Sequence, residues 1–182
     1  MLTGRPLDVA MNERTVLAVQ ADNSEVAWTR RGDLGLDQDG FLRTGEGHLV
    51  LDDALQPIQL PLGSFTYNIT SDGTIGVIDT NNLSAGTVPI ANLGLRDATG
   101  IDLARREDGL FKPLTNTEDR QDFVSGTGVA SVTSGSLEGS NVSTVETLVR
   151  FIDHTRSFEM QTKMIKEMKD NDSNGSSMMR LS

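Results

Sequence analysis

The chain has 182 residues and a mass of 19.7 kDa, enough for one domain with an appendage or for two small domains. Its 26 acidic and 16 basic side chains give a net charge of −10. This balance argues against nucleic acid and anionic membrane surfaces as partners, because both attract basic proteins. Cysteine is absent, which excludes disulfides, cysteine zinc ligands and thiol nucleophiles. No apolar run approaches the roughly 18 residues of a membrane span, so we expect no direct membrane insertion.

Proline, glycine and charge divide the chain near residue 143. All five prolines and 17 of the 18 glycines precede this point. Residues 1–142 carry the whole net charge of −10, whereas residues 143–182 hold equal numbers of acidic and basic side chains. We therefore predict three parts. They are a β-rich body over 1–114, a connector rich in serine, threonine and glycine over 115–142 with a possible edge strand, and a C-terminal assembly helix and tail over 143–182.

Short apolar runs separated by turn residues predict strands throughout the body. Asp-Gly recurs at Asp39, Asp72 and Asp108, and each pair predicts a hairpin because both residue types suit left-handed turn positions. Residues 101–106 and 129–137 are compatible with either strand or loop. The predicted fold class is mainly β, with an antiparallel sandwich-like or barrel-like body and a long C-terminal α-helix. The expected strands are 15–20, 26–30, 34–36, 65–69, 75–78 and 88–95.

The C-terminal part begins with a helix start signal. Ser143, Thr144, Val145 and Glu146 match the capping box, in which the serine and the glutamate bond each other's backbone N–H groups. From there to about residue 170, no glycine or proline interrupts a sequence rich in helix formers. Residues 171–177 are poorer helix formers, and they either end the helix or fray.

The apolar side chains of this predicted helix change side along its length. At about 100° per residue, one set falls in a single sector and a later set falls in a different one. Polar residues 153–157 separate the two sets. A helix that lies on one core keeps one stripe, so we predict that both sets contact other protein chains, the alternative being an ordinary amphipathic helix with an irregular pattern. The first set is Val145, Leu148, Val149 and Ile152, and the second is Phe158, Met160, Met164, Ile165 and Met168.

Motifs for catalysis or ligand binding are incomplete. Residues 35–46 nearly fit a calcium-binding EF-hand loop, but Gly35 stands where the first carboxylate is required, which favours a hairpin turn. Asp153 and His154 are neighbours on a predicted helix and do not face each other. Residues 126–128 lack the third glycine of a dinucleotide fingerprint and the lysine of a phosphate-binding loop. We therefore predict no enzyme activity, no catalytic residue, no cofactor and no metal site.

Three stretches carry more specific motifs. The first is Thr3-Gly4-Arg5-Pro6-Leu7-Asp8-Val9-Ala10. The second combines Trp28-Thr29-Arg30-Arg31-Gly32-Asp33-Leu34 with Asp37-Gln38-Asp39-Gly40-Phe41-Leu42, and the third is Leu137-Glu138-Gly139-Ser140-Asn141-Val142. Together they resemble the bacterial flagellar rod and hook proteins, in which the third motif introduces the C-terminal helix. Residues 156–165 and the ending Arg180-Leu181-Ser182 most resemble the proximal rod proteins of that family, with distal rod or hook subunits as the alternative.

The resemblance implies a structural subunit of the flagellar basal body in the periplasmic space. It implies delivery by the flagellar type III export apparatus, and helical polymerisation with copies of itself and other rod proteins to transmit torque. It also implies an N-terminal helix paired with the C-terminal one, which we expect to be missing because Met1 leads directly into the body. A β-rich surface or phage fibre with a coiled-coil tail is the alternative of another class. Its heptad would be incomplete, with Thr155, Thr162 and Lys169 at an apolar position.

Overall fold

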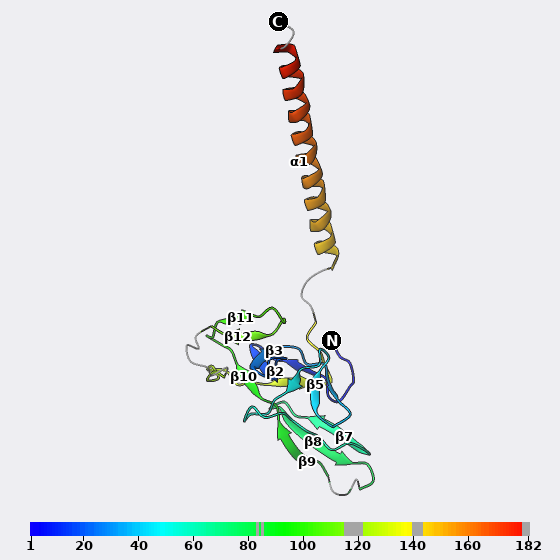
Figure 1. Cartoon of the computed structure of the whole chain (residues 1–182). Coiled ribbons are helices and arrows are strands. Elements are labelled where there is room, and N and C mark those ends of the chain that lie inside the picture. The colour runs from blue at the N-terminus through cyan, green and yellow to red at the C-terminus, as the bar shows by residue number, and fades with distance from the viewer. Residues whose placement is uncertain (83, 85, 115–121, 140–143, 180–182) are drawn as a thin grey trace. The chain divides into compact units, whose positions relative to one another are not determined.

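The computed structural model describes residues 1–82, 84, 86–114, 122–139 and 144–179, the last ten of these as helical backbone only. The chain divides into two compact units, Met1–Gly139 and Ser140–Ser182. Within the described residues the first unit holds all the strands and the second holds one helix (Figure 1). This confirms the predicted fold class, which was mainly antiparallel β with a C-terminal α-helix.

The strands of the body are short, and most follow the predicted runs. In chain order they are β1 (Val9–Met11), β2 (Thr15–Gln20), β3 (Val26–Thr29), β4 (Leu34–Leu36), β5 (Leu42–Thr44), β6 (Leu49–Val50), β7 (Phe65–Ile69), β8 (Thr74–Asp79), β9 (Val88–Asn92), β10 (Leu95–Asp97), β11 (Leu103–Arg105), β12 (Phe111–Pro113) and β13 (Val132–Ser134). The helix is α1 (Thr144–Met179).

These strands form three antiparallel sheets. The largest follows the order β11-β12-β3-β2-β6-β5-β4, the second is β7-β8-β9, and the third pairs β1 with β13. Strand β2 is the centre of the largest sheet, because it pairs with β3 on one edge and shares its other edge between β6 and β10. Leu17 of β2, for example, lies opposite Thr29 on one side and Leu95 on the other.

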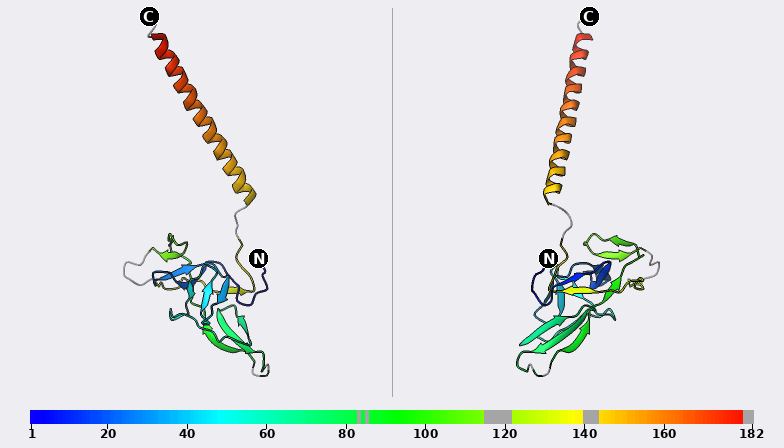
Figure 2. Two further views of the ribbon diagram at one scale, coloured as in Figure 1. Left: turned by 45° about the vertical axis from the view of Figure 1, so that its right-hand side comes forward. Right: turned by 180° about the vertical axis from the view of Figure 1, so that it is seen from behind.

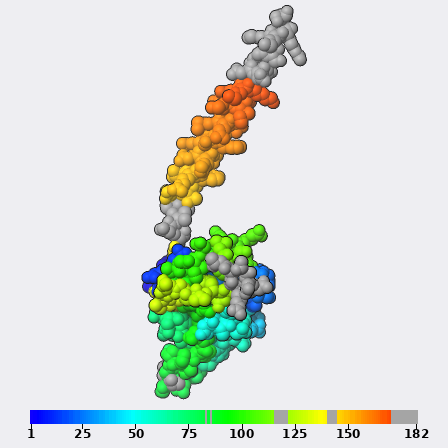
Figure 3. Space-filling view, turned by 90° about the vertical axis from the view of Figure 1, so that its left-hand side faces the viewer, coloured from blue at the N-terminus to red at the C-terminus, as the bar shows by residue number. Residues whose placement is uncertain are grey.

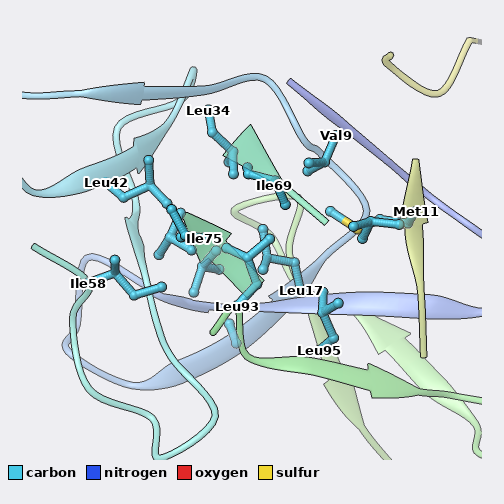
Figure 4. Close-up of a cluster of buried hydrophobic side chains, with 14 of the residues drawn as sticks. Val9, Met11, Leu17, Leu34, Leu42, Ile58, Ile69, Ile75, Leu93 and Leu95 are labelled. Carbon is cyan, nitrogen blue, oxygen red and sulfur yellow. The ribbon is translucent and has the colours of Figure 1, made fainter. Parts of the chain in front are cut away.

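Both faces of β2 are buried, as its run of apolar residues requires. Leu17 and Val19 point into the larger core, which is also lined by residues from β1, β7 and β8 (Figure 4). Val16 and Ala18 point to the opposite face and pack in a second cluster with Trp28. The alternation of side chains along one strand therefore joins two layers of core.

All three Asp-Gly pairs close hairpins, as predicted. They join β4 to β5, β7 to β8 and β11 to β12. The three glycines have φ angles of +84° at Gly40, +88° at Gly73 and +82° at Gly109. Side chains with a Cβ adopt this left-handed conformation only with strain, so the sequence signal has a direct backbone cause.

In four other places the structure differs from the prediction or decides between its alternatives. The run 88–95 is two strands, because the chain changes partner along it: β9 pairs with β8, whereas β10 pairs with β2. Residues 101–106 and 129–137 contain short strands, β11 and β13. The helix continues through residues 171–177 to Met179, since the one glycine there weakens a helix by about 1 kcal/mol, far less than a proline would.

Candidate functional site

More than half of the exposed large apolar side chains among the described residues lie on α1. All nine helix residues predicted to contact other chains are solvent-exposed, from 43% at Ile152 to 71% at Val145. Full burial of such a side chain contributes about 1.5–3 kcal/mol of stabilisation. Contact with another chain could therefore stabilise an assembly considerably. The exposure makes them available for contact, and the contact itself stays a prediction.

The two apolar sets lie on different sides of one continuous helix. Residues 153–157, which separate the sets, are helical, so the spacing of 100° per residue applies across them. Charged residues Glu159, Lys163, Lys166 and Glu167 follow on the side that is apolar in the first half. Such a helix presents apolar contacts in one direction near its start and in another direction further along.

Two threonine hydroxyls between the apolar residues form hydrogen bonds within the helix. The hydroxyl of Thr155 donates to the carbonyl of Phe151, and that of Thr162 donates to the carbonyl of Phe158, each at 2.9 Å. These hydroxyls therefore need no outside partner. Phe151 is itself 68% exposed and stands seven residues before Phe158, on nearly the same side. Phe151 stands outside the predicted contact set, although an aromatic residue at this position is a visible signal in the sequence.

The helix begins at Thr144, one residue into the predicted capping box. Ser143, the predicted capping residue, lies outside the described residues, and so do Ser140, Asn141 and Val142 of the predicted family signature. The remaining signature residues, Leu137, Glu138 and Gly139, end the β body.

Glu138 is bound by Arg30 through two parallel hydrogen bonds. Nε of Arg30 donates to Oε2 of Glu138 and Nη2 donates to Oε1, both at 2.8 Å. This forked geometry is the one in which arginine binds a carboxylate most specifically. It joins two of the sequence motifs, since Arg30 belongs to the tryptophan-containing stretch and Glu138 to the stretch before the helix.

The same guanidinium also holds the backbone around β1 and β2. Nη1 donates to the carbonyl oxygens of Glu13 at 2.7 Å and Thr15 at 3.0 Å, and Nη2 donates to that of Met11 at 3.2 Å. Arg30 thus connects the last residues of the body to its central strands. Sequence reasoning missed this role, because 108 positions separate the two partners and neither local pattern indicates the other.

The start of the chain lies beside this closing segment. The N–H of Thr3 donates to the carbonyl of Gly135 at 2.9 Å, and the N–H of Leu137 donates to the carbonyl of Met1 at 2.8 Å. Strands β1 and β13 continue the same antiparallel pairing further into the body. Both views of Figure 2 show the first residues, in dark blue, next to the yellow segment that contains β13.

The first sequence motif, residues 3–10, contains an ion pair between Arg5 and Asp8. Asp8 is fully buried, and Arg5 donates from Nε to its Oδ2 at 2.8 Å while Nη2 lies 2.8 Å from Oδ1. A buried carboxylate is costly unless it is paired in this way. The motif therefore has a structural explanation within the β body.

The segment that resembles an EF-hand loop is the hairpin turn between β4 and β5. Asp37 accepts the N–H groups of Asp39 and Phe41, and Nε of Arg43 donates to it at 2.7 Å. The Arg43 hydrogen bond holds the pKa of the Asp37 carboxyl below its usual value. The charge of this carboxylate is thus balanced by Arg43 within the predicted hairpin.

The described residues lack two further kinds of feature. They contain no group of three or more histidine, aspartate or glutamate side chains placed to hold a metal ion. Within the same residues, no helix is both long enough and apolar enough to cross a membrane.

Two family models match the chain. "Flagellar hook protein FlgE/F/G D1 domain" matches residues 10–77, which span β1 to β7 and most of β8. "Flagellar basal body rod FlgEFG protein C-terminal" matches residues 133–178, which include most of β13 and nearly all of α1. The two matches fall on the β body and on the helix with its closing segment.

Individual relatives agree with these models. The chain is 35% identical to "Flagellar basal-body rod protein FlgF" of Escherichia coli over 181 residues, which cover 99% of the chain and 71% of that protein. It is 34% identical to the protein of the same name from Salmonella typhimurium, with the same coverage. It is 30% identical to "Flagellar basal-body rod protein FlgG" of Bacillus subtilis, over 90% of the chain and 61% of that protein.

Proposed function

Since the chain belongs to the flagellar basal-body rod protein family, we propose that it is a proximal-rod subunit whose helix α1 is contacted by several neighbouring subunits. A structural subunit of the basal-body rod is the function that the family supports. The proximal position rests on the resemblance of residues 156–165 to the proximal rod proteins. It rests also on the fuller match to FlgF, at 35% identity and 71% coverage, than to FlgG, at 30% and 61%.

The exposed apolar side chains of α1 are the observation that carries this proposal. Nine predicted contact residues and Phe151 are exposed on one helix, and they face more than one direction. In a helical polymer each subunit has several neighbours, so one helix is contacted from several sides. The second apolar set would then bury against one neighbour and the first set against another.

Charge supports the same arrangement. The part of the chain that holds α1 carries equal numbers of acidic and basic side chains, whereas the β body carries the net charge of −10. Closely packed copies of a neutral helix avoid the repulsion that acidic segments would create. The acidic bodies would form an outer layer around the closely packed helices.

The remaining parts of the proposal follow from the family. The partners are copies of this chain and other rod proteins, the location is the periplasmic part of the basal body, and delivery is by the flagellar export apparatus. Names of structural rod proteins among the relatives support a structural role, with no catalytic step. Torque would pass from subunit to subunit through these helix contacts.

Replacement of one apolar helix residue by a charged one tests the proposal. Met164→Glu places a carboxylate in the second apolar set, where Met164 is 61% exposed. In cells that lack their own copy of the gene, this variant should fold its β body normally but fail to enter rods, with loss of motility. Burial of an unpaired charge in a contact costs several kcal/mol, which corresponds to more than about a hundredfold in affinity.

Lys163→Glu is the matched control. It also introduces a carboxylate, one residue away, on the side of the helix that already carries Glu159, Lys166 and Glu167. We expect it to support motility, because its carboxylate can stay in solvent. Normal rods with Met164→Glu, or equal loss with both variants, would show that the helix is not contacted through the predicted surface. Failure of the unchanged chain to enter rods would contradict the rod function itself.

A further inference from the structure

The sheet formed by β7, β8 and β9 is unusually poor in charge. Residues 61–95 contain two charged side chains, Asp72 and Asp79, whereas the chain's average of 23% would give about eight. Both aspartates accept hydrogen bonds from residues close to them in the chain. Asp72 accepts hydrogen bonds from Thr70 and Thr74, and Asp79 accepts the N–H of Asn81 at 2.8 Å. The rest of this segment is neutral.

Strand pairing shows which neutral residues share the outer face of this sheet. Thr66 lies opposite Ile78, and Gly76 lies between Asn68 and Pro89. Their neighbours along the strands, such as Ile69 and Ile75, point to the other face and join the core (Figure 4). Because side chains alternate along a strand, the five outer residues form one face without any charge.

The edge of the same sheet exposes apolar side chains. Among the described strands, β9 pairs with β8 alone. Its Val88 is 52% exposed and its Ile90 is 44% exposed, and Leu62 before β7 is 50% exposed. Strand β9 carries no charge, while Pro89 and the bulge opposite Gly76 limit the addition of a further strand, so the exposed side chains are what this edge offers for contact. Figure 3 shows this part of the chain, in green, at one end of the β body.

We propose that this neutral sheet face packs against the β body of a second copy of this chain in the assembled rod. We define the neutral sheet face as three outer-face residues and three exposed apolar residues at the margin of the sheet. The outer-face residues are Thr66, Ile78 and Pro89, and the margin residues are Leu62, Val88 and Ile90. Val88 lies opposite Val77, so its exposure comes from its place on the open edge. The inference rests on the proposed function, and it adds a contact made by the body to the contacts made by the helix. Depletion of charge around exposed apolar side chains is the composition found at the centre of protein interfaces.

Charge favours a second copy as the occupant, because this face is a place where two acidic bodies can touch without repulsion. Residues 1–142 have a net charge of −10, so two bodies that touch through ordinary surface repel each other within the Debye length of about 8 Å. A neutral face can lie against an acidic neighbour without this repulsion. Contact between two identical neutral faces would close a dimer and stop growth, so the face meets a different surface of the next body, as continuous polymers require.

Photo-crosslinking from a single cysteine tests the contact. The chain contains no cysteine, so Val88→Cys can be labelled with a benzophenone maleimide without background. The full chain is labelled, assembled rods are isolated and illuminated, and the products are identified by mass. Val124→Cys is the control, since Val124 is also an exposed valine of the body, at 89%, outside the neutral sheet face.

The expected product at Val88→Cys is an adduct heavier by one further chain, 19.7 kDa, and the control should give none. An adduct with a different rod protein, no adduct from fully labelled rods, or equal adducts from both variants would overturn the inference. Each of these results needs rods that contain the chain. Absence of the chain from rods would instead contradict the proposed function, so the two failures are distinguishable.

Discussion

Replacement of Arg30 offers a quantitative test of how the β body is closed. In Arg30→Ala, the carbonyl oxygens of Met11, Glu13 and Thr15 lose their guanidinium donors, and Glu138 loses both of its hydrogen bonds. A hydrogen bond from a charged donor is worth about 1.5–3 kcal/mol when buried. Because the Arg30 side chain is 28% exposed, we take about 1 kcal/mol for each carbonyl.

The ion pair contributes less than the carbonyl contacts. Glu138 is 45% exposed, and ion pairs in such positions are worth about 0.2–1 kcal/mol. Arg30→Ala should therefore lower the free energy of unfolding by about 3–4 kcal/mol, and Glu138→Ala by less than about 1 kcal/mol. Arg30→Lys should recover about 1 kcal/mol, since a single ammonium cannot reach all the carbonyl oxygens at once.

Urea unfolding followed by tryptophan fluorescence measures these differences. Trp28 is the single tryptophan of the chain and is fully buried in the body, so its signal reports the body without the helix. For a domain of this size, the Arg30→Ala loss also corresponds to a melting temperature lower by about 10 °C. Equal costs for Arg30→Ala and Glu138→Ala would refute the assignment to the carbonyl groups. A cost below about 1 kcal/mol for Arg30→Ala would refute the closing role altogether.

Two further predictions use the same measurement. Gly32→Ala should destabilise the body by about 3 kcal/mol, because the added Cβ would lie 1.8 Å from the carbonyl oxygen of Val9. Gly35→Ala should change the stability little, because a Cβ there would have no atom within 4 Å. Equal effects of the two substitutions would contradict the steric explanation. The hydrogen bond from Thr99 holds the pKa of Asp97 below its ordinary value of 3.8, so the charged form stabilises the body above that pH, and this stabilisation is lost as pH falls further. The urea midpoint should be constant from about pH 7 to pH 5 and fall below about pH 4, and an equally steep fall in Asp97→Asn would contradict the role of this carboxylate.

Local signals predicted the hairpins and the helix. The pair Asp39-Gly40 needs only its own backbone preference to form a turn, and the structure has a positive φ there. The helix likewise follows from a run without proline between residues 144 and 174 and with a single glycine at 175. Each of these features depends on residues close together in the chain.

Strands with distant partners were harder to predict. Strand β1 has three residues and pairs with β13, more than 100 positions later. So short a strand has no periodicity of its own, and the pairing that stabilises it depends on how the whole body closes. The strands β6 and β12 escaped prediction for the same reason, since they are two and three residues long.

The sequence by itself therefore determined the division into an acidic β-rich part and a neutral helix, the turns between neighbouring strands, and the family. Each of these depends on composition, on local backbone preference or on short motifs. Only the tertiary structure decided that Arg30 binds Glu138 and which face of the β7-β8-β9 sheet turns away from the core. Contacts of this kind join residues far apart in the chain, and their geometry exists only after strand pairing has set the register.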